Sequence, residues 1–125
     1  MSNGANMKLV VNLLVLRCKD IEVTRRFYEQ LGLGFVEGKH GSGPQHYAWE
    51  SDGFVLELYP AGEGQAPDNV RLGFTTRLLA DVSGNLLHRS DVNILKQPHA
   101  TADRLVMLLQ DPDGRKVEVS QPLHR

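Results

Sequence analysis

The stretch LLVLRCKDIEVTRRFYEQLGLGF, residues 13–35, predicts a strand followed directly by a helix. Apolar and β-branched residues run from Val10 to Arg17, which is typical of a buried strand. The side chain of Asp20 can accept hydrogen bonds from the free N–H groups at a helix N-terminus. Apolar residues then recur at helical spacing up to Leu31, and glycines follow. We therefore expect a strand over residues 10–17 and an amphipathic helix over residues 20–31.

The segment after this helix predicts a β-hairpin. His46–Ser51 and Phe54–Tyr59 have the composition of strands, and only Asp-Gly separates them. A two-residue Asp-Gly loop is typical of a tight hairpin and fixes the register of its strands. This register places His46 opposite Tyr59, on the face that Glu57 shares.

The order of elements then begins again after a linker-like segment, PAGEGQAPDN, residues 60–69. We expect a strand over 70–76, a helix from residue 78, a short strand over 91–95 with a loop over 96–102, and a closing hairpin over 104–110 and 115–120. Each half reads β-α-β-β-β, and such an internal repeat defines the architecture. The prediction is an α+β fold with module one at about residues 9–60 and module two at about 70–122. Together they form one domain, residues 8–125, after a disordered tail, residues 1–7.

Composition excludes several classes of function. The chain has 125 residues, of which 41% are hydrophobic, and 14 Lys and Arg balance 15 Asp and Glu. This balance offers no positive field for nucleic acid or an anionic membrane, and no apolar run is long enough to span a bilayer. Cys18 is the single cysteine, so no intramolecular disulfide can form. We expect a cytoplasmic protein with a buried, structural thiol.

The last strand of each module carries a glutamate in its middle. In FVLELY the apolar stripe is Phe54, Leu56 and Leu58, so Glu57 points to the other face. In RKVEVS the same alternation turns Glu118 away from its valines. A face turned to solvent explains one such residue. When two such glutamates occupy equivalent positions of a repeat, a shared ligand cavity explains them as well as exposure to solvent does.

These segments resemble the vicinal oxygen chelate superfamily, which contains glyoxalase I, bleomycin-resistance proteins and extradiol dioxygenases. The likeness covers about residues 9–122 and rests on the stretch at 13–35, on FVLELYP at 54–60 and on DPDGRKVEVSQP at 111–122. It implies a curved mixed sheet whose concave face forms the ligand cavity, and it implies a homodimer. One fold serves many functions, so the likeness alone does not give the activity.

The resemblance also implies a metal site in many members, with ligands on the first and last strand of each module. The last-strand positions are Glu57 and Glu118, whereas the first-strand positions are Leu13 and Arg71. Leucine has no lone pair and arginine stays protonated, so neither can ligate a metal. We therefore expect no cofactor. The alternative is a divalent ion held weakly by Glu57 and Glu118.

The expected cavity contains several polar side chains. Arg71 can form an ion pair with Glu118 in place of a metal, or else extend to the rim. In relatives resembling glyoxalase I, an arginine at the position of Arg17 holds an anionic part of the substrate; a salt bridge is the alternative. The full set of predicted cavity residues is Glu57, Glu118, Arg71, His46, Tyr59, Arg17 and Leu13.

Two functions fit this set. The first is metal-independent binding of a small organic molecule, on the model of the bleomycin-resistance members. The second is a glyoxalase-type lyase or isomerase that uses a weakly held ion or one glutamate as a base. A third reading is an interaction module with a vestigial cavity.

Overall fold

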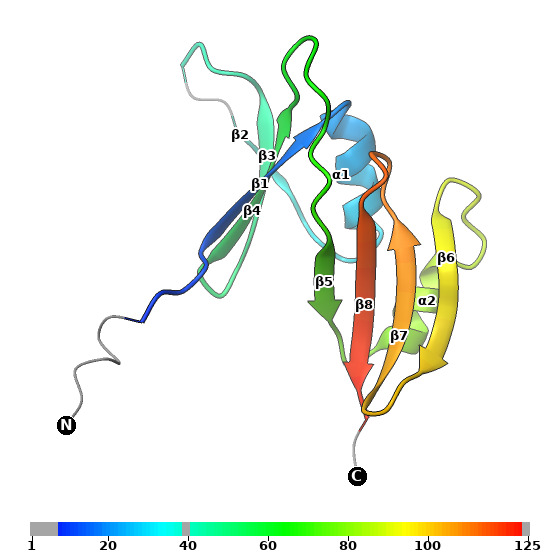
Figure 1. The fold of residues 1–125 in the computed structure, drawn as a ribbon. Helices are drawn as coiled ribbons and strands as arrows, with labels where there is room; N and C mark the ends of the chain where they lie inside the picture. Colours follow the sequence, from blue (N-terminus) through cyan, green and yellow to red (C-terminus); the bar gives the residue numbers. More distant parts are fainter. Residues whose placement is uncertain (1–7, 39–40, 124–125) are drawn as a thin grey trace, which may run out of the picture.

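The computed structural model describes residues 8–38 and 41–123, and the tail predicted over residues 1–7 lies outside them. The elements follow one another twice in the order strand, helix and three strands (Figure 1). Module one contains β1 (Leu13–Cys18), α1 (Ile21–Glu29), β2 (Val36–Gly38), β3 (His46–Ser51) and β4 (Phe54–Pro60). Module two contains β5 (Leu72–Thr75), α2 (Leu79–Leu86), β6 (Asn93–Ala100), β7 (Arg104–Gln110) and β8 (Lys116–Pro122). The predicted α+β class is confirmed.

Each module forms its own four-stranded mixed sheet. The strand orders are β1-β4-β3-β2 and β5-β8-β7-β6, so the same connection is used twice. β1 runs parallel to β4 and β5 runs parallel to β8, while the other neighbours are antiparallel. The curved mixed sheet expected from the repeat therefore consists of two sheets, with β1 and β5 each at an edge. No helix in the described part of the chain is long and apolar enough to cross a membrane.

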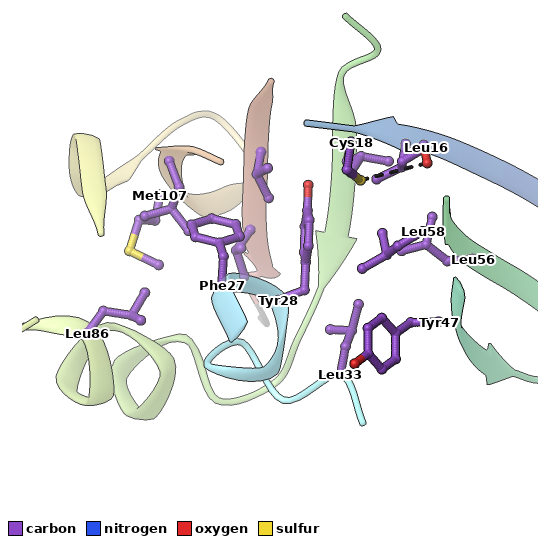
Figure 2. Packing of buried hydrophobic residues seen from close by; sticks show 14 of the residues in the cluster. Leu16, Cys18, Phe27, Tyr28, Leu33, Tyr47, Leu56, Leu58, Leu86 and Met107 are labelled. Carbon is purple, nitrogen blue, oxygen red and sulfur yellow. Dashed lines mark hydrogen bonds between the residues drawn. The ribbon is translucent and has the colours of Figure 1, made fainter. Parts of the chain in front are cut away.

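The hydrophobic core joins the two modules through α1. Phe27 and Tyr28 extend from this helix between the side chains of both sheets (Figure 2). Leu56 and Leu58 of β4 are buried there, and so are Val117 and Val119 of β8. The core-facing residues lie at alternate positions, so Glu57 and Glu118 point to the opposite, open faces of their sheets. The predicted face assignment is confirmed.

The hairpin between β3 and β4 has the predicted register. Ser51 pairs with Phe54 and Ala48 pairs with Glu57. Asp52 and Gly53 both adopt positive φ, 51° and 84°. This is the left-handed conformation that a type I′ turn needs at both central residues.

Two strands differ from the prediction. β1 begins at Leu13, and residues 9–11 before it are exposed although their side chains are apolar. Apolar composition indicates burial only where another surface covers the chain, and nothing in the described residues covers this segment. β6 continues to Ala100 through residues predicted as a loop. It is the edge strand of its sheet, and shifts in its register around Lys96 accommodate Pro98, which an interior strand would not tolerate.

Asp20 caps α1 as predicted, and its removal gives a first test. Its carboxylate Oδ1 accepts hydrogen bonds from the backbone N–H groups of Glu22 at 3.0 Å and Val23 at 3.4 Å. We expect Asp20→Ala to lower the free energy of unfolding by about 1 kcal/mol, because these donors lose their acceptor. Asp20→Ser keeps an acceptor and serves as the control in urea denaturation. Equal midpoints for wild type and Asp20→Ala would contradict the prediction.

Candidate functional site

The open face of the first sheet brings together five of the predicted cavity residues. Leu13 and Arg17 of β1 lie beside Val55 and Tyr59 of β4, because the two strands are parallel and in register. Val15, between them on β1, is the partner of Glu57. The half-buried carboxylate of Glu57 therefore lies between apolar neighbours, Val15 on one side and Ala48 on the other. His46 of β3 lies beside Tyr59 and is the fifth predicted cavity residue on this face.

Three of these side chains form a stack. The ring of His46 lies parallel to that of Tyr59, with centroids 4.4 Å apart and an interplanar angle of 5°. The guanidinium carbon of Arg17 lies 5.2 Å from the centroid of Tyr59. His46 is buried, and a Cβ at Gly38 would come within 2.9 Å of its Nε2. Gly38 thus permits the close approach of the imidazole, and the stack gives this face a planar, cationic end.

A pocket of about 350 Å³ opens next to this stack. Its lining comes from Arg17 and from the segment after β4: Ala61, Gly62, Gln65 and Ala66. The segment was predicted as a linker and was not expected to carry any part of the site. Its small residues leave room beside the Arg17 guanidinium. Gln65 is the other polar side chain among the lining residues.

The open face of the second sheet contains the predicted pair of Arg71 and Glu118. Arg71 Nη2 lies 3.2 Å from Glu118 Oε1. The side chain of Arg71 is 58% exposed and that of Glu118 is 29% exposed. Arg71 lies just before β5 rather than within the strand, which explains its exposure. A pair this open to water stabilises the fold by about 1 kcal/mol at most.

Sequence reasoning missed a second arginine at Glu118. Arg104 Nη1 lies 3.6 Å from Glu118 Oε2 and donates a hydrogen bond to Ser120 Oγ at 3.2 Å. Both carboxylate oxygens therefore face a guanidinium. The β7–β8 register places Leu108 opposite Glu118, so Arg104 lies on the same face by alternation. That pattern was available from the sequence of the closing hairpin.

The residues present do not fit the metal that the fold suggests. Glu57 and Glu118 belong to different sheets, and both oxygens of Glu118 face arginines. Leu13 and Arg71 contribute no ligand atom. Within residues 8–38 and 41–123, no three His, Cys, Asp or Glu side chains are grouped so as to hold a metal ion. We therefore derive no chemistry through a metal.

A second group of charged residues, which the sequence did not reveal, is centred on Arg115. Its side chain is 0% exposed. Arg115 Nη1 lies 2.9 Å from Asp111 Oδ2 and 3.1 Å from Asp113 Oδ2, while Nε lies 2.8 Å from Asp68 Oδ1. A fourth contact reaches the first module, where Nη2 donates to the backbone oxygen of Arg17 at 2.5 Å. We call Arg115, Asp68, Asp111 and Asp113 the Arg115 cluster.

The Arg115 cluster connects the two modules. Asp68 Oδ2 accepts a hydrogen bond from the backbone N–H of Arg17, and Asp113 Oδ1 accepts one from that of Lys19. Tyr28 Oη donates to Asp111 Oδ2 at 2.6 Å. The end of β1, helix α1, the segment before β5 and the β7–β8 turn thus meet at one buried cation.

The protonation of the Arg115 cluster follows from these contacts. Burial alone would lower the pKa of the Arg115 guanidinium, but hydrogen bonds to Asp68 and Asp111 raise it above its usual range. Burial would raise the pKa of Asp68, but hydrogen bonds from Arg115 and the Arg17 N–H lower it. Both groups are therefore charged at neutral pH.

Cys18 lies at the edge of the Arg115 cluster and has the properties of a structural thiol. Burial raises its pKa to about 11, against the opposing effects of Arg115 and of a hydrogen bond with Thr24. Cys18 Sγ donates to the backbone oxygen of Leu16 at 3.7 Å. A protonated, buried thiol is unreactive, as expected from the sequence.

Comparison with known proteins identifies the family. The model of the Glyoxalase/Bleomycin resistance protein/Dioxygenase superfamily matches residues 10–119, which is most of the chain. The chain belongs to this superfamily. The resemblance seen in the segments at 13–35, 54–60 and 111–122 is therefore confirmed.

Several solved structures are similar to this chain over almost its whole length. A virulence protein, STM3117, from Salmonella typhimurium is 25% identical over 93% of this chain and 98% of its own, with a TM-score of 0.68. TnmS3, an antibiotic binding protein from Streptomyces sp. CB03234, is 22% identical with the same coverage and a TM-score of 0.76. A glyoxalase/dioxygenase from Nostoc punctiforme is 20% identical over 99% of this chain and 97% of its own, with a TM-score of 0.75. The last two likenesses show the fold alone. No curated protein matches the chain significantly.

Proposed function

We propose that this superfamily member binds a small organic molecule on the open faces of its sheets without using a metal ion. The observation that carries the proposal is the environment of Glu118, whose two oxygens face Arg71 and Arg104. Two guanidinium groups neutralise the carboxylate that a metal would otherwise use. Arg104 Nε also lies 3.7 Å from Asp103 Oδ1, so the charges of this group balance. The exposed guanidinium groups keep N–H donors for an acidic group of the ligand.

The first sheet supplies complementary features. Leu13, Val15 and Val55 provide an apolar surface, and the stack of Arg17, Tyr59 and His46 provides a planar end. Apolar walls with a few fixed polar groups are typical of small-molecule sites. TnmS3, an antibiotic binding protein, has this fold, so the fold is compatible with binding of a small molecule. The preference for binding over catalysis rests on the arginines at Glu118.

We further propose a cytoplasmic homodimer in which each ligand site lies between copies. β1 and β5 are both edge strands, and unpaired edges can add a strand from another chain. Residues 9–11, apolar and exposed, directly precede β1. Burial of this segment against a second copy would remove apolar surface from water.

The alternative function is a lyase or isomerase that uses Glu57 as a general base. Its half-buried carboxylate lies between Val15 and Ala48 on the open face, where a positioned carboxylate can take a proton from a bound ligand. A weakly held divalent ion would serve the same class of reaction.

Elemental analysis and ligand screening distinguish these functions. We expect purified protein to contain less than a tenth of an equivalent of Zn, Ni, Fe or Mn, and aromatic carboxylic acids to raise its melting temperature with EDTA present. Arg71→Leu should abolish this shift, whereas Arg77→Leu, which removes an exposed arginine just after β5, should not. Stoichiometric metal, or a shift that needs added metal, would overturn the proposal and favour the enzyme.

A further inference from the structure

A separate pocket of about 250 Å³ lies between the two modules, on the side of the sheets that carries the helices. Residues from α1's C-terminal turn, β3, β5, α2 and β8 surround it. The lining residues are Leu31, Leu33, Trp49, Ser51, Phe74, Thr75, Thr76, Val82 and Val119.

This pocket is distinct from the proposed ligand faces, because strand alternation separates the two. Trp49 pairs with Leu56 and Phe74 pairs with Val119, and both partners face the core. Glu57 and Glu118 lie on the opposite faces of the same strands. A ligand in this pocket would therefore not contact either glutamate.

The chemistry of the lining is neutral and aromatic. No lining residue is charged, whereas the pocket beside Arg17 and the two along α1 each contain a charged side chain. Trp49 and Phe74 meet edge to face, with ring centroids 6.5 Å apart and an interplanar angle of 68°. Ser51 and Thr76 contribute hydroxyl groups; Thr76 Oγ1 accepts a hydrogen bond from the backbone N–H of Leu78 at 3.0 Å and can still donate one. Thr75, next to Phe74 on β5, turns its side chain to the face that Glu118 shares. A charged ligand would lose its hydration here without gaining a counter-ion.

We propose that this pocket binds a small neutral aromatic molecule with one hydroxyl group. Its ring packs against Trp49 and Phe74, and its hydroxyl group bonds with the hydroxyl groups of Ser51 and Thr76. An apolar cavity of roughly 150 Å³ is enough to hold benzene, so a pocket of this size accommodates one substituted ring. The proposal is independent of the metal-free binding proposed for the open faces.

Trp49 gives a direct measurement, since it is the only tryptophan in the chain. We expect 4-nitrobenzyl alcohol to quench its fluorescence saturably, after correction for absorption by the ligand. The anion 4-nitrobenzoate has nearly the same shape. Measured in the Arg71→Leu variant, which removes the acid site proposed for the open face, it should have a dissociation constant at least tenfold higher than the alcohol. Linear quenching of equal strength by both compounds would indicate random collision and would overturn the proposal.

Two variants and a matched control locate the site. Val82→Phe fills the pocket from α2, and Ser51→Phe covers it from an exposed position at the end of β3, on the face of Trp49. Either should raise the dissociation constant of 4-nitrobenzyl alcohol at least tenfold. Val23→Phe makes the same change on α1 outside this pocket and should leave the constant unchanged. Unchanged binding in a folded Val82→Phe or Ser51→Phe protein would overturn the proposal. So would a dissociation constant that rises with protein concentration, because a second copy would then be covering the pocket.

Discussion

Replacement of Arg115 by leucine is expected to lower the free energy of unfolding by about 3–5 kcal/mol. The variant would leave the carboxylates of Asp111 and Asp113 buried, with side-chain exposures of 0% and 4%, beside Asp68 and without their cation. A buried charge that has lost its partner bears a desolvation penalty that water cannot relieve. Because Arg115 also donates to the backbone oxygen of Arg17, the variant weakens the contact between modules. We therefore expect the two modules to unfold less cooperatively, seen as a smaller dependence of stability on urea concentration.

Arg71→Leu is the matched control for this prediction. It also removes an arginine from a carboxylate, but the Arg71 side chain is 58% exposed. Its loss should change the free energy of unfolding by about 1 kcal/mol at most. Urea denaturation followed by circular dichroism measures both variants. Similar losses of stability in the two variants would contradict the role assigned to the Arg115 cluster.

Truncation of Leu16 to alanine is expected to lower the free energy of unfolding by about 2–5 kcal/mol. Leu16 is 0% exposed and packs in the core with Leu56 and Leu58 (Figure 2). The substitution removes this packing and leaves a cavity that rigid neighbours fill only in part.

Leu13→Ala makes the same chemical change on the opposite face of β1. Leu13 is 50% exposed, so its loss should change the free energy of unfolding by about 0.5 kcal/mol or less. Thermal denaturation of both variants tests the face assignment on which the open-face site depends. A larger effect at Leu13 than at Leu16 would show that the alternation of β1 has been assigned to the wrong faces.

The elements that could be predicted from the sequence are those that depend on neighbouring residues. Alternation along six residues turned Glu57 and Glu118 away from the core, because successive side chains of a strand point to opposite faces. Asp-Gly fixed the hairpin register through its positive φ angles, and Asp20 fixed the start of α1. The pair of Arg71 and Glu118 followed from the repeat, because the first and last strands lie side by side in each module.

The features that only the tertiary structure decided depend on distant residues. Arg115 reads locally as the first residue of a half-buried strand after a turn. Its burial results from Asp68, 47 residues away in an apparent linker, and from the backbone of Arg17, 98 residues away. The neutral pocket at Trp49 likewise exists only where the two modules meet. Local spacing encodes the direction of a side chain, but its partners and its exposure are set by the packing of one module against the other.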